Sequence, residues 1–181
     1  MLFTGPGRLP FVWGATAAEV ADTYGCDALL PDAPDRLVRA VGSRATPARL
    51  YRWLCQLRLA PYSYDLVDNY GRRSPRALVP GTEDLAVGQT VATIFTLAAF
   101  TPDEELTLRI KGGRPYLVFG DLAVSYAVRP ADGGSRLVAV LRCTDPPGPA
   151  GALRRRLLSW GDVPMMRKQL LTLAALAERS G

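Results

Sequence analysis

Side chains that can bind a polar ligand group or transfer a proton are concentrated in one segment of this 181-residue chain: Tyr62, Tyr64, Asp65, Asp68, Asn69, Tyr70, Arg72 and Arg73. A tyrosine hydroxyl beside an aspartate carboxylate can donate a hydrogen bond to a ligand carbonyl or move a proton. A neighbouring arginine can stabilise the enolate oxygen that forms during an aldol-type ring closure. This chemistry assigns catalytic roles to Tyr64, Asp65 and Arg73.

A structural role for the same segment is the alternative. Asp65 or Asp68 can pair with Arg72 or Arg73 and hold the loop against the edge of a sheet. A divalent metal between the two aspartates is not expected, because two carboxylates and one amide supply fewer oxygen ligands than Ca²⁺ requires. The sequence leaves the catalytic and the structural role open.

Histidine is absent from the chain, which removes the commonest general base near neutral pH and the commonest metal ligand. The three cysteines, Cys26, Cys55 and Cys143, form an odd number without CxxC spacing, which predicts reduced thiols in a cytoplasmic protein. We interpret Cys55, beside Leu54 on an expected helix, as a small buried hydrophobe. Because GxSxG and glycine-rich phosphate motifs are also missing, we expect neither a metal nor an organic cofactor.

The net charge and the apolar content of the chain limit the classes of partner that we expect. The formal net charge is +5, from 22 basic and 17 acidic residues, and the arginines are spread along the chain, with three in a row only at residues 154–156. This is a weak electrostatic footprint, so we expect no nucleic-acid partner. We also expect no membrane span, because the sequence lacks a run of about 18 apolar residues.

The first 33 residues are interpreted as an extension packed on the core. They are rich in glycine and proline, and they include a short helix pattern with Thr16 as N-cap and Glu19 at the capping-box position. Trp13 and Tyr24 are expected to anchor this segment by burial of their rings.

A helix is predicted immediately before the polar segment. Thr46 can cap it, Pro47 suits its first turn, and Pro61 requires that it has ended. The apolar residues recur at i, i+3, i+4 and i+7 and give the helix one buried face: Leu50, Trp53, Leu54 and Leu57.

Strand-like alternation and β-rich composition dominate the chain on both sides of this helix. The runs cover residues 36–41, 90–100, 105–110, 122–128 and 135–143. Turn residues separate several of them, notably at 111–113 and 131–134, which favours an antiparallel meander.

The chain is predicted to end in a long helix that begins at Asp162 as N-cap, with Pro164 in its first turn. Four apolar residues share one face of it: Met166, Leu170, Leu173 and Ala177. A helix of about 18 residues extends for about 27 Å, which is enough to lie across a sheet.

This order of elements resembles the helix-grip fold of the SRPBCC superfamily, which includes START and birch-pollen-allergen proteins. The segments 53–58, 60–65 and 71–75, with Trp160-Gly161-Asp162 near the C-terminus, resemble a bacterial branch labelled polyketide cyclase or dehydrase. The resemblance implies an α+β domain over residues 34–181, in which a curved antiparallel sheet wraps around a long C-terminal helix and short helices follow the first strand.

In such a fold a cavity is expected between the concave face of the sheet and the C-terminal helix. The residues that we expect to line or close it are Trp53, Tyr62, Asn69, Arg72, Phe95, Arg109, Tyr126, Trp160 and Met166. For Trp53, Phe95 and Met166, plain core packing is the alternative, because aromatic residues and methionine are ordinary core residues. Arg109 has an outward, solvated position as its alternative.

Three functions are compatible with these features. The first is binding of a hydrophobic or aromatic small molecule, the second is a polyketide cyclase or aromatase using acid–base catalysis, and the third is an interaction module with a filled core. The expected partner is an apolar or polyketide-like small molecule, and the expected oligomeric state is a monomer or a homodimer. The fold alone does not separate these functions.

Overall fold

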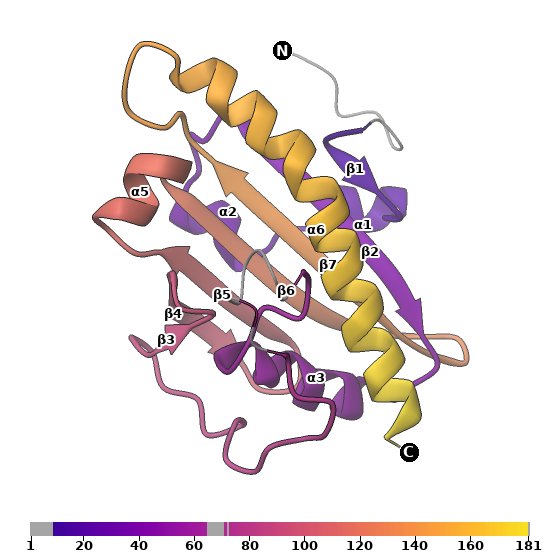
Figure 1. The fold of residues 1–181 in the computed structure, drawn as a ribbon. Helices are drawn as coiled ribbons and strands as arrows, with labels where there is room; N and C mark the ends of the chain where they lie inside the picture. The colour runs from indigo at the N-terminus through magenta and orange to yellow at the C-terminus, as the bar shows by residue number, and fades with distance from the viewer. Residues whose placement is uncertain (1–8, 65–70, 72, 181) are drawn as a thin grey trace.

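A seven-stranded sheet is the framework of the part of the chain that the computed structural model describes, namely residues 9–64, 71 and 73–180 (Figure 1). Its spatial order is β1-β2-β7-β6-β5-β4-β3, and every neighbouring pair is antiparallel except β1 with β2. The strands are β1 Val12–Trp13, β2 Asp35–Ser43, β3 Thr90–Val91, β4 Phe95–Thr101, β5 Glu105–Ile110, β6 Leu122–Ala131 and β7 Gly134–Cys143. The predicted antiparallel meander is thereby confirmed.

Helices cover both faces of this sheet (Figure 1). They are α1 Ala17–Ala21, α2 Gly25–Leu29, α3 Pro47–Cys55, α5 Arg114–Phe119 and α6 Gly151–Arg179, with a 3₁₀ turn at Gln56–Arg58. The long helix α6 lies across one face together with α3, and α1 and α2 lie behind the opposite face. No helix in these described ranges is long and apolar enough to cross a membrane.

The alternation along the strands divides the buried residues into two cores. Leu37 of β2 lies opposite Leu141 of β7, and both belong to the larger core under α3 and α6. Their neighbours Val38 and Val140 are also paired but belong to the smaller core under α2. Successive side chains of a strand point to opposite faces, so each central strand contributes to both cores.

The N-terminal segment approaches the second face of the sheet at Gly25. The backbone N–H of Gly25 donates to the Glu105 carboxylate at 2.8 Å, and a Cβ atom at Gly25 would lie 2.3 Å from the hydroxyl of Thr107. Only glycine permits so close an approach. The predicted capping box at Thr16 and Glu19 is confirmed. The division of the chain at residue 33 stays a prediction.

Helix α3 forms as its sequence predicts. Thr46 accepts a hydrogen bond from the backbone N–H of Arg49, Pro47 occupies the first turn, and the predicted apolar face is buried. The β-rich run at 90–100 is divided into β3 and β4, because Ala92 and Thr93 adopt positive φ angles of 43° and 67° and reverse the chain. The sequence gives little sign of this turn, since neither residue favours that conformation.

The predicted start of the C-terminal helix is wrong. Helix α6 begins at Gly151 and has 29 residues, so Asp162 lies inside the helix and does not cap it. The residues before Asp162 are mainly leucine, arginine and alanine, which are strong helix formers. Pro164 lacks an N–H and removes one hydrogen bond of the helix, but it lies on the exposed side. Propensity over three turns thus outweighs the proline.

Substitution of Leu173 by alanine tests the packing of α6. Leu173 is fully buried in the larger core, so Leu173→Ala should lower the free energy of unfolding by about 2–5 kcal/mol, because it leaves a cavity. Leu171→Ala, two residues away but 45% exposed, should change it by less than about 0.5 kcal/mol. Urea denaturation of both variants measures the difference, and equal effects would contradict the described orientation of α6.

Candidate functional site

A cavity of about 560 Å³ lies between the sheet and the N-terminal part of α6. Its floor comes from the sheet face that carries the larger core, and includes Leu37, Leu108, Val124, Tyr126 and Leu141. Its roof comes from α6 and includes Leu158, Asp162, Met165, Met166 and Gln169. Pro61, Ser63, Phe95, Phe119 and Leu157 are among the other residues of the lining. The site is therefore mostly apolar, with a few polar groups.

Strand register brings the floor residues together. Val124 of β6 lies opposite Leu108 of β5 on one side and Leu141 of β7 on the other. Tyr126 follows two positions along β6 and therefore points to the same face. The alternation of side chains along these strands, which the sequence shows, therefore places the floor residues on one face of the sheet.

One polar contact crosses the cavity from the sheet to α6. The hydroxyl of Tyr126 donates to Oε1 of Gln169 at 2.7 Å, and Nε2 of Gln169 donates to the carbonyl of Pro61 at 2.5 Å. Burial raises the pKa of Tyr126 above its ordinary value of 10. The phenol stays neutral near pH 7, so it acts as a hydrogen-bonding group.

A buried ion pair forms the second polar group. Nη2 of Arg39 lies 3.2 Å from Oδ2 of Asp162, and the side chain of Arg39 is fully buried. The other terminal nitrogen of Arg39 donates to the carbonyls of Phe11 and Val38. The pair joins β2, the segment before β1, and the roof of the cavity. Removal of either partner would leave an uncompensated charge in the interior.

The carboxyl group of Asp162 is less acidic than an exposed aspartate. Burial raises the pKa of Asp162 to about 6, although the Arg39 guanidinium acts in the opposite direction. The Tyr126 phenol lies within the electrostatic influence of this carboxyl. A group with a pKa near the working pH can both accept and donate a proton, so the cavity contains one potential acid–base residue.

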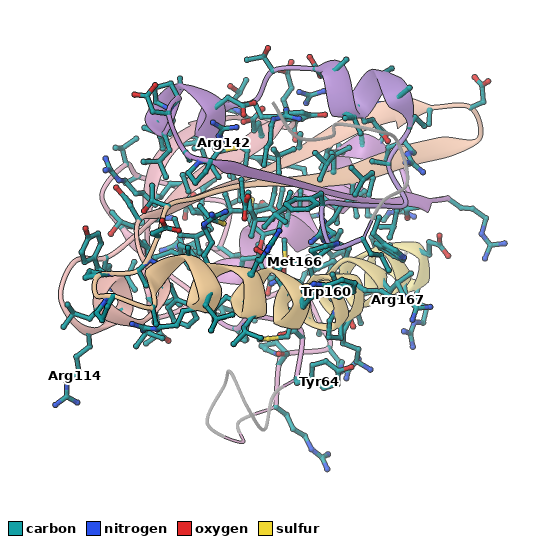
Figure 2. All side chains as sticks on the ribbon, turned by 90° about the horizontal axis from the view of Figure 1, so that it is seen from above. Tyr64, Arg114, Arg142, Trp160, Met166 and Arg167 are labelled. Carbon is teal, nitrogen blue, oxygen red and sulfur yellow. The ribbon has the colours of Figure 1, made fainter. Side chains whose placement is uncertain are left out.

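The structure places three of the residues named from the sequence in the cavity lining. Phe95, Tyr126 and Met166 all line the cavity, and Figure 2 shows Met166 on the side of α6 that faces the sheet. Trp53 and Tyr62 are fully buried in the core beside it, with their rings edge to face at 6.3 Å. The indole N–H of Trp53 donates to the hydroxyl of Ser180, which ties α3 to the end of α6.

The other predicted site residues lie apart from the cavity lining or outside the described residues. Arg109 forms an ion pair with Asp121 at 2.6 Å on the surface, which is the outward alternative. Trp160 and Tyr64 are 54% and 45% exposed, and Arg73 is exposed as well. Asp65, Asn69 and Arg72 lie outside the described residues, so their roles stay predictions.

The sequence contains signals for the polar residues that we did not predict. The unpredicted Asp162 and Gln169 share the i, i+4, i+7 spacing with Met166. This spacing places all three on one face once the helix extends upstream of Asp162. Arg39 shares strand parity with Leu37 and Val41, and this parity marks it as inward facing. We did not predict an inward position for Arg39 because it is charged, and a buried arginine is rare unless it is paired.

The cysteines are not arranged as nucleophiles. Cys55 is fully buried, as predicted, and burial raises its pKa to about 12. Cys143 lines the cavity, and burial raises its pKa as well. Protonated thiols are weak nucleophiles and weak metal ligands. Within the described ranges no three Cys, Asp or Glu side chains are grouped closely enough to hold a metal ion.

Comparison with known proteins extends this description. No protein-family model and no curated protein matches the chain. Among solved structures, protein MLL2253 from Mesorhizobium loti has a TM-score of 0.50 at 17% identity, covering 81% of this chain and 98% of its own. Protein CV1439 from Chromobacterium violaceum has a TM-score of 0.51 at 17% identity, covering 80% and 98%. The di-domain ARO/CYC StfQ from the steffimycin biosynthetic pathway has a TM-score of 0.49 at 15% identity, covering 80% of this chain and 51% of StfQ.

At these identities the likeness concerns the fold. The curved antiparallel sheet, the short helices after the first long strand and the long C-terminal helix define the helix-grip architecture. The chain therefore has a helix-grip fold, as its sequence resemblance predicts.

Titration of Asp162 tests the electrostatics of the cavity. Carboxyl NMR should show one aspartate with a pKa of about 6 that is missing in Asp162→Asn. Arg39→Met should raise this pKa further, because it removes the guanidinium that lowers it. Arg109→Met, which removes a surface partner of Asp121, should leave it unchanged.

The same shift affects stability. The folded pKa of Asp162 is raised above its ordinary value of 3.8, so its stabilising contribution is complete below pH 3.8 and is lost as the pH rises through 6. An Asp162 signal that titrates near pH 4 in the folded protein would show that the carboxyl is solvated.

Proposed function

We propose that this protein binds a hydrophobic or aromatic small molecule in the cavity between the sheet and α6. The observation that carries the proposal is the cavity itself, whose volume of about 560 Å³ lies in the range of small-molecule sites. An apolar hollow of this size loses dispersion contacts when it holds nothing that fits it. A ligand with apolar atoms restores those contacts. The interaction-module hypothesis, which requires a filled core, is disfavoured on the same ground.

The polar groups of the lining would orient the ligand. The Tyr126 oxygen donates to Gln169 and keeps acceptor capacity for a ligand hydroxyl or amide. Asp162 uses Oδ2 for Arg39, and Oδ1 has no hydrogen-bond partner among the described residues. Both groups favour a ligand that is apolar over most of its surface and carries a donor at the end near α6.

Binding of a neutral fluorescent probe tests the proposal. N-phenyl-1-naphthylamine should bind the wild-type protein saturably, and Val124→Phe should weaken binding at least tenfold, because the added ring fills the centre of the floor. Val87→Phe is the matched control, since Val87 is 65% exposed and lies apart from the cavity lining. Circular dichroism confirms that both variants fold. Equal affinity of a folded Val124→Phe variant would overturn the assignment of the site.

A second candidate function is acid–base catalysis of ring closure in a polyketide-like substrate. It is supported by one observation, the raised pKa of Asp162 in the same cavity as Tyr126. Under this hypothesis Asp162 performs the proton transfer that we assigned from the sequence to Tyr64, Asp65 and Arg73. Asp162 would remove a proton from the carbon that attacks and deliver it to the carbonyl oxygen, and a second transfer from the same carbon to the resulting hydroxyl would release water.

Mass spectrometry distinguishes turnover from binding. A poly-β-ketone thioester incubated with the protein should lose the mass of one water molecule if the protein catalyses closure and dehydration. Asp162→Asn should lower that rate at least a hundredfold, within the range of general acid–base effects, while Asp132→Asn, at an exposed position in the turn between β6 and β7, should not. An unchanged rate in Asp162→Asn would exclude the catalytic role of this carboxyl.

A further inference from the structure

The outward face of α6 carries a row of exposed apolar side chains. Leu153, Leu157 and Trp160 are 62%, 64% and 54% exposed and follow the i, i+4, i+7 spacing, and Pro164 continues the row. We call these four residues the outer stripe. An exposed apolar row on a helix that already buries its opposite face requires a partner to explain it.

Basic residues accompany the outer stripe. Arg156, Arg167 and Lys168 are exposed on the same helix. Between residues 151 and 177 the only acidic residue is Asp162, which faces inward and pairs with Arg39. A helix with leucine and tryptophan bordered by arginine and lysine has the composition of helices that lie in the interface of a lipid bilayer.

Helix α5 extends this surface at the N-terminal end of α6. Nη2 of Arg154 donates to the carbonyls of both Leu117 and Val118 at 3.0 Å, which joins the two helices. The side chains of Leu117 and Val118 are 56% and 46% exposed. Arg114 begins α5, and Figure 2 shows its side chain projecting away from the molecule on the side where α6 lies.

The cavity reaches the surface at this place. Leu157 belongs both to the outer stripe and to the cavity lining. Phe119, the last residue of α5, also lines the cavity directly after the exposed Val118. The exposed apolar surface therefore borders the mouth of the cavity.

The basic charge of this surface favours an anionic bilayer over a second copy of the chain as its partner. A second copy of the chain packed face to face would bring Arg156, Arg167 and Lys168 of both copies together without carboxylates to pair with them. An anionic bilayer supplies the opposite charge and also accepts the apolar side chains.

We propose that the outer stripe and α5 dock on an anionic lipid bilayer, with the mouth of the cavity directed at the membrane. In this orientation an apolar ligand would pass between the bilayer and the cavity, and this part of the proposal rests on the proposed function. The docking itself rests only on the surface and its charge.

Vesicle co-sedimentation tests the docking. The wild-type protein should bind phosphatidylcholine vesicles that contain phosphatidylglycerol, and should bind at least tenfold more weakly to phosphatidylcholine alone. Leu153→Glu should weaken binding at least tenfold, since it places a carboxylate in the stripe but suits the first turn of α6. Val87→Glu, at an equally exposed position elsewhere, is the control.

Arg156→Glu should remove most of the preference for anionic vesicles, whereas Arg49→Glu on α3 should not. The emission of Trp160 should shift to shorter wavelength on binding, and Trp160→Phe should lose that shift. Absence of binding to both kinds of vesicle, or equal binding by Leu153→Glu, would overturn the proposal. A wild-type dimer that Leu153→Glu dissociates in analytical ultracentrifugation would instead identify the stripe as a homodimer contact.

Probe binding in solution separates this proposal from the proposed function. Leu153 and Arg156 lie apart from the cavity lining, so the variants at these positions should keep their affinity for N-phenyl-1-naphthylamine. Vesicle binding without probe binding would uphold the docking and reject the ligand site. Probe binding without vesicle binding would do the reverse.

Discussion

The packing of the C-terminal half of α6 against β2 and α3 is the interaction on which the rest of the structure depends. Leu170, Leu173 and Ala177 are buried there, and Trp53 of α3 fixes the last turn through Ser180. The N-terminal half of the same helix has few buried residues and spans the cavity. The C-terminal half of α6 is thus held in place by packing, and its N-terminal half covers the cavity without filling it.

The polar groups of the site come from distant parts of the chain. Arg39 lies on an early strand and Asp162 on the last helix, and Tyr126 donates to Gln169, which in turn donates to the loop carbonyl of Pro61. Each contact satisfies a group that would be costly to bury alone, so the apolar cavity and its polar contacts stabilise each other. Chemistry in this cavity therefore depends on the long-range packing of α6 and not on any short motif.

The sequence predicts the elements that local patterns determine. Alternation locates the strands, and the spacing of Leu50, Trp53 and Leu54 locates α3. The start of α6 was predicted wrongly, because Asp162 and Pro164 have the chemistry of a helix start, whereas the helix propensity of the residues before them extends the helix upstream. The polar cluster illustrates the same limit, since Tyr62 is buried and Tyr64 is half exposed although one residue separates them. Proximity in sequence does not imply convergence in space.

Pro164 has a mechanical consequence for the protein. It lies in the part of α6 that roofs the cavity, between Asp162 and Met165, and it cannot donate the hydrogen bond that would join its turn to the carbonyl of Trp160. The turns of α6 before and after Pro164 are therefore coupled less stiffly than in an uninterrupted helix. The part of the roof before Pro164 is thus joined to the packed C-terminal half of the helix by one hydrogen bond fewer than in a helix without proline.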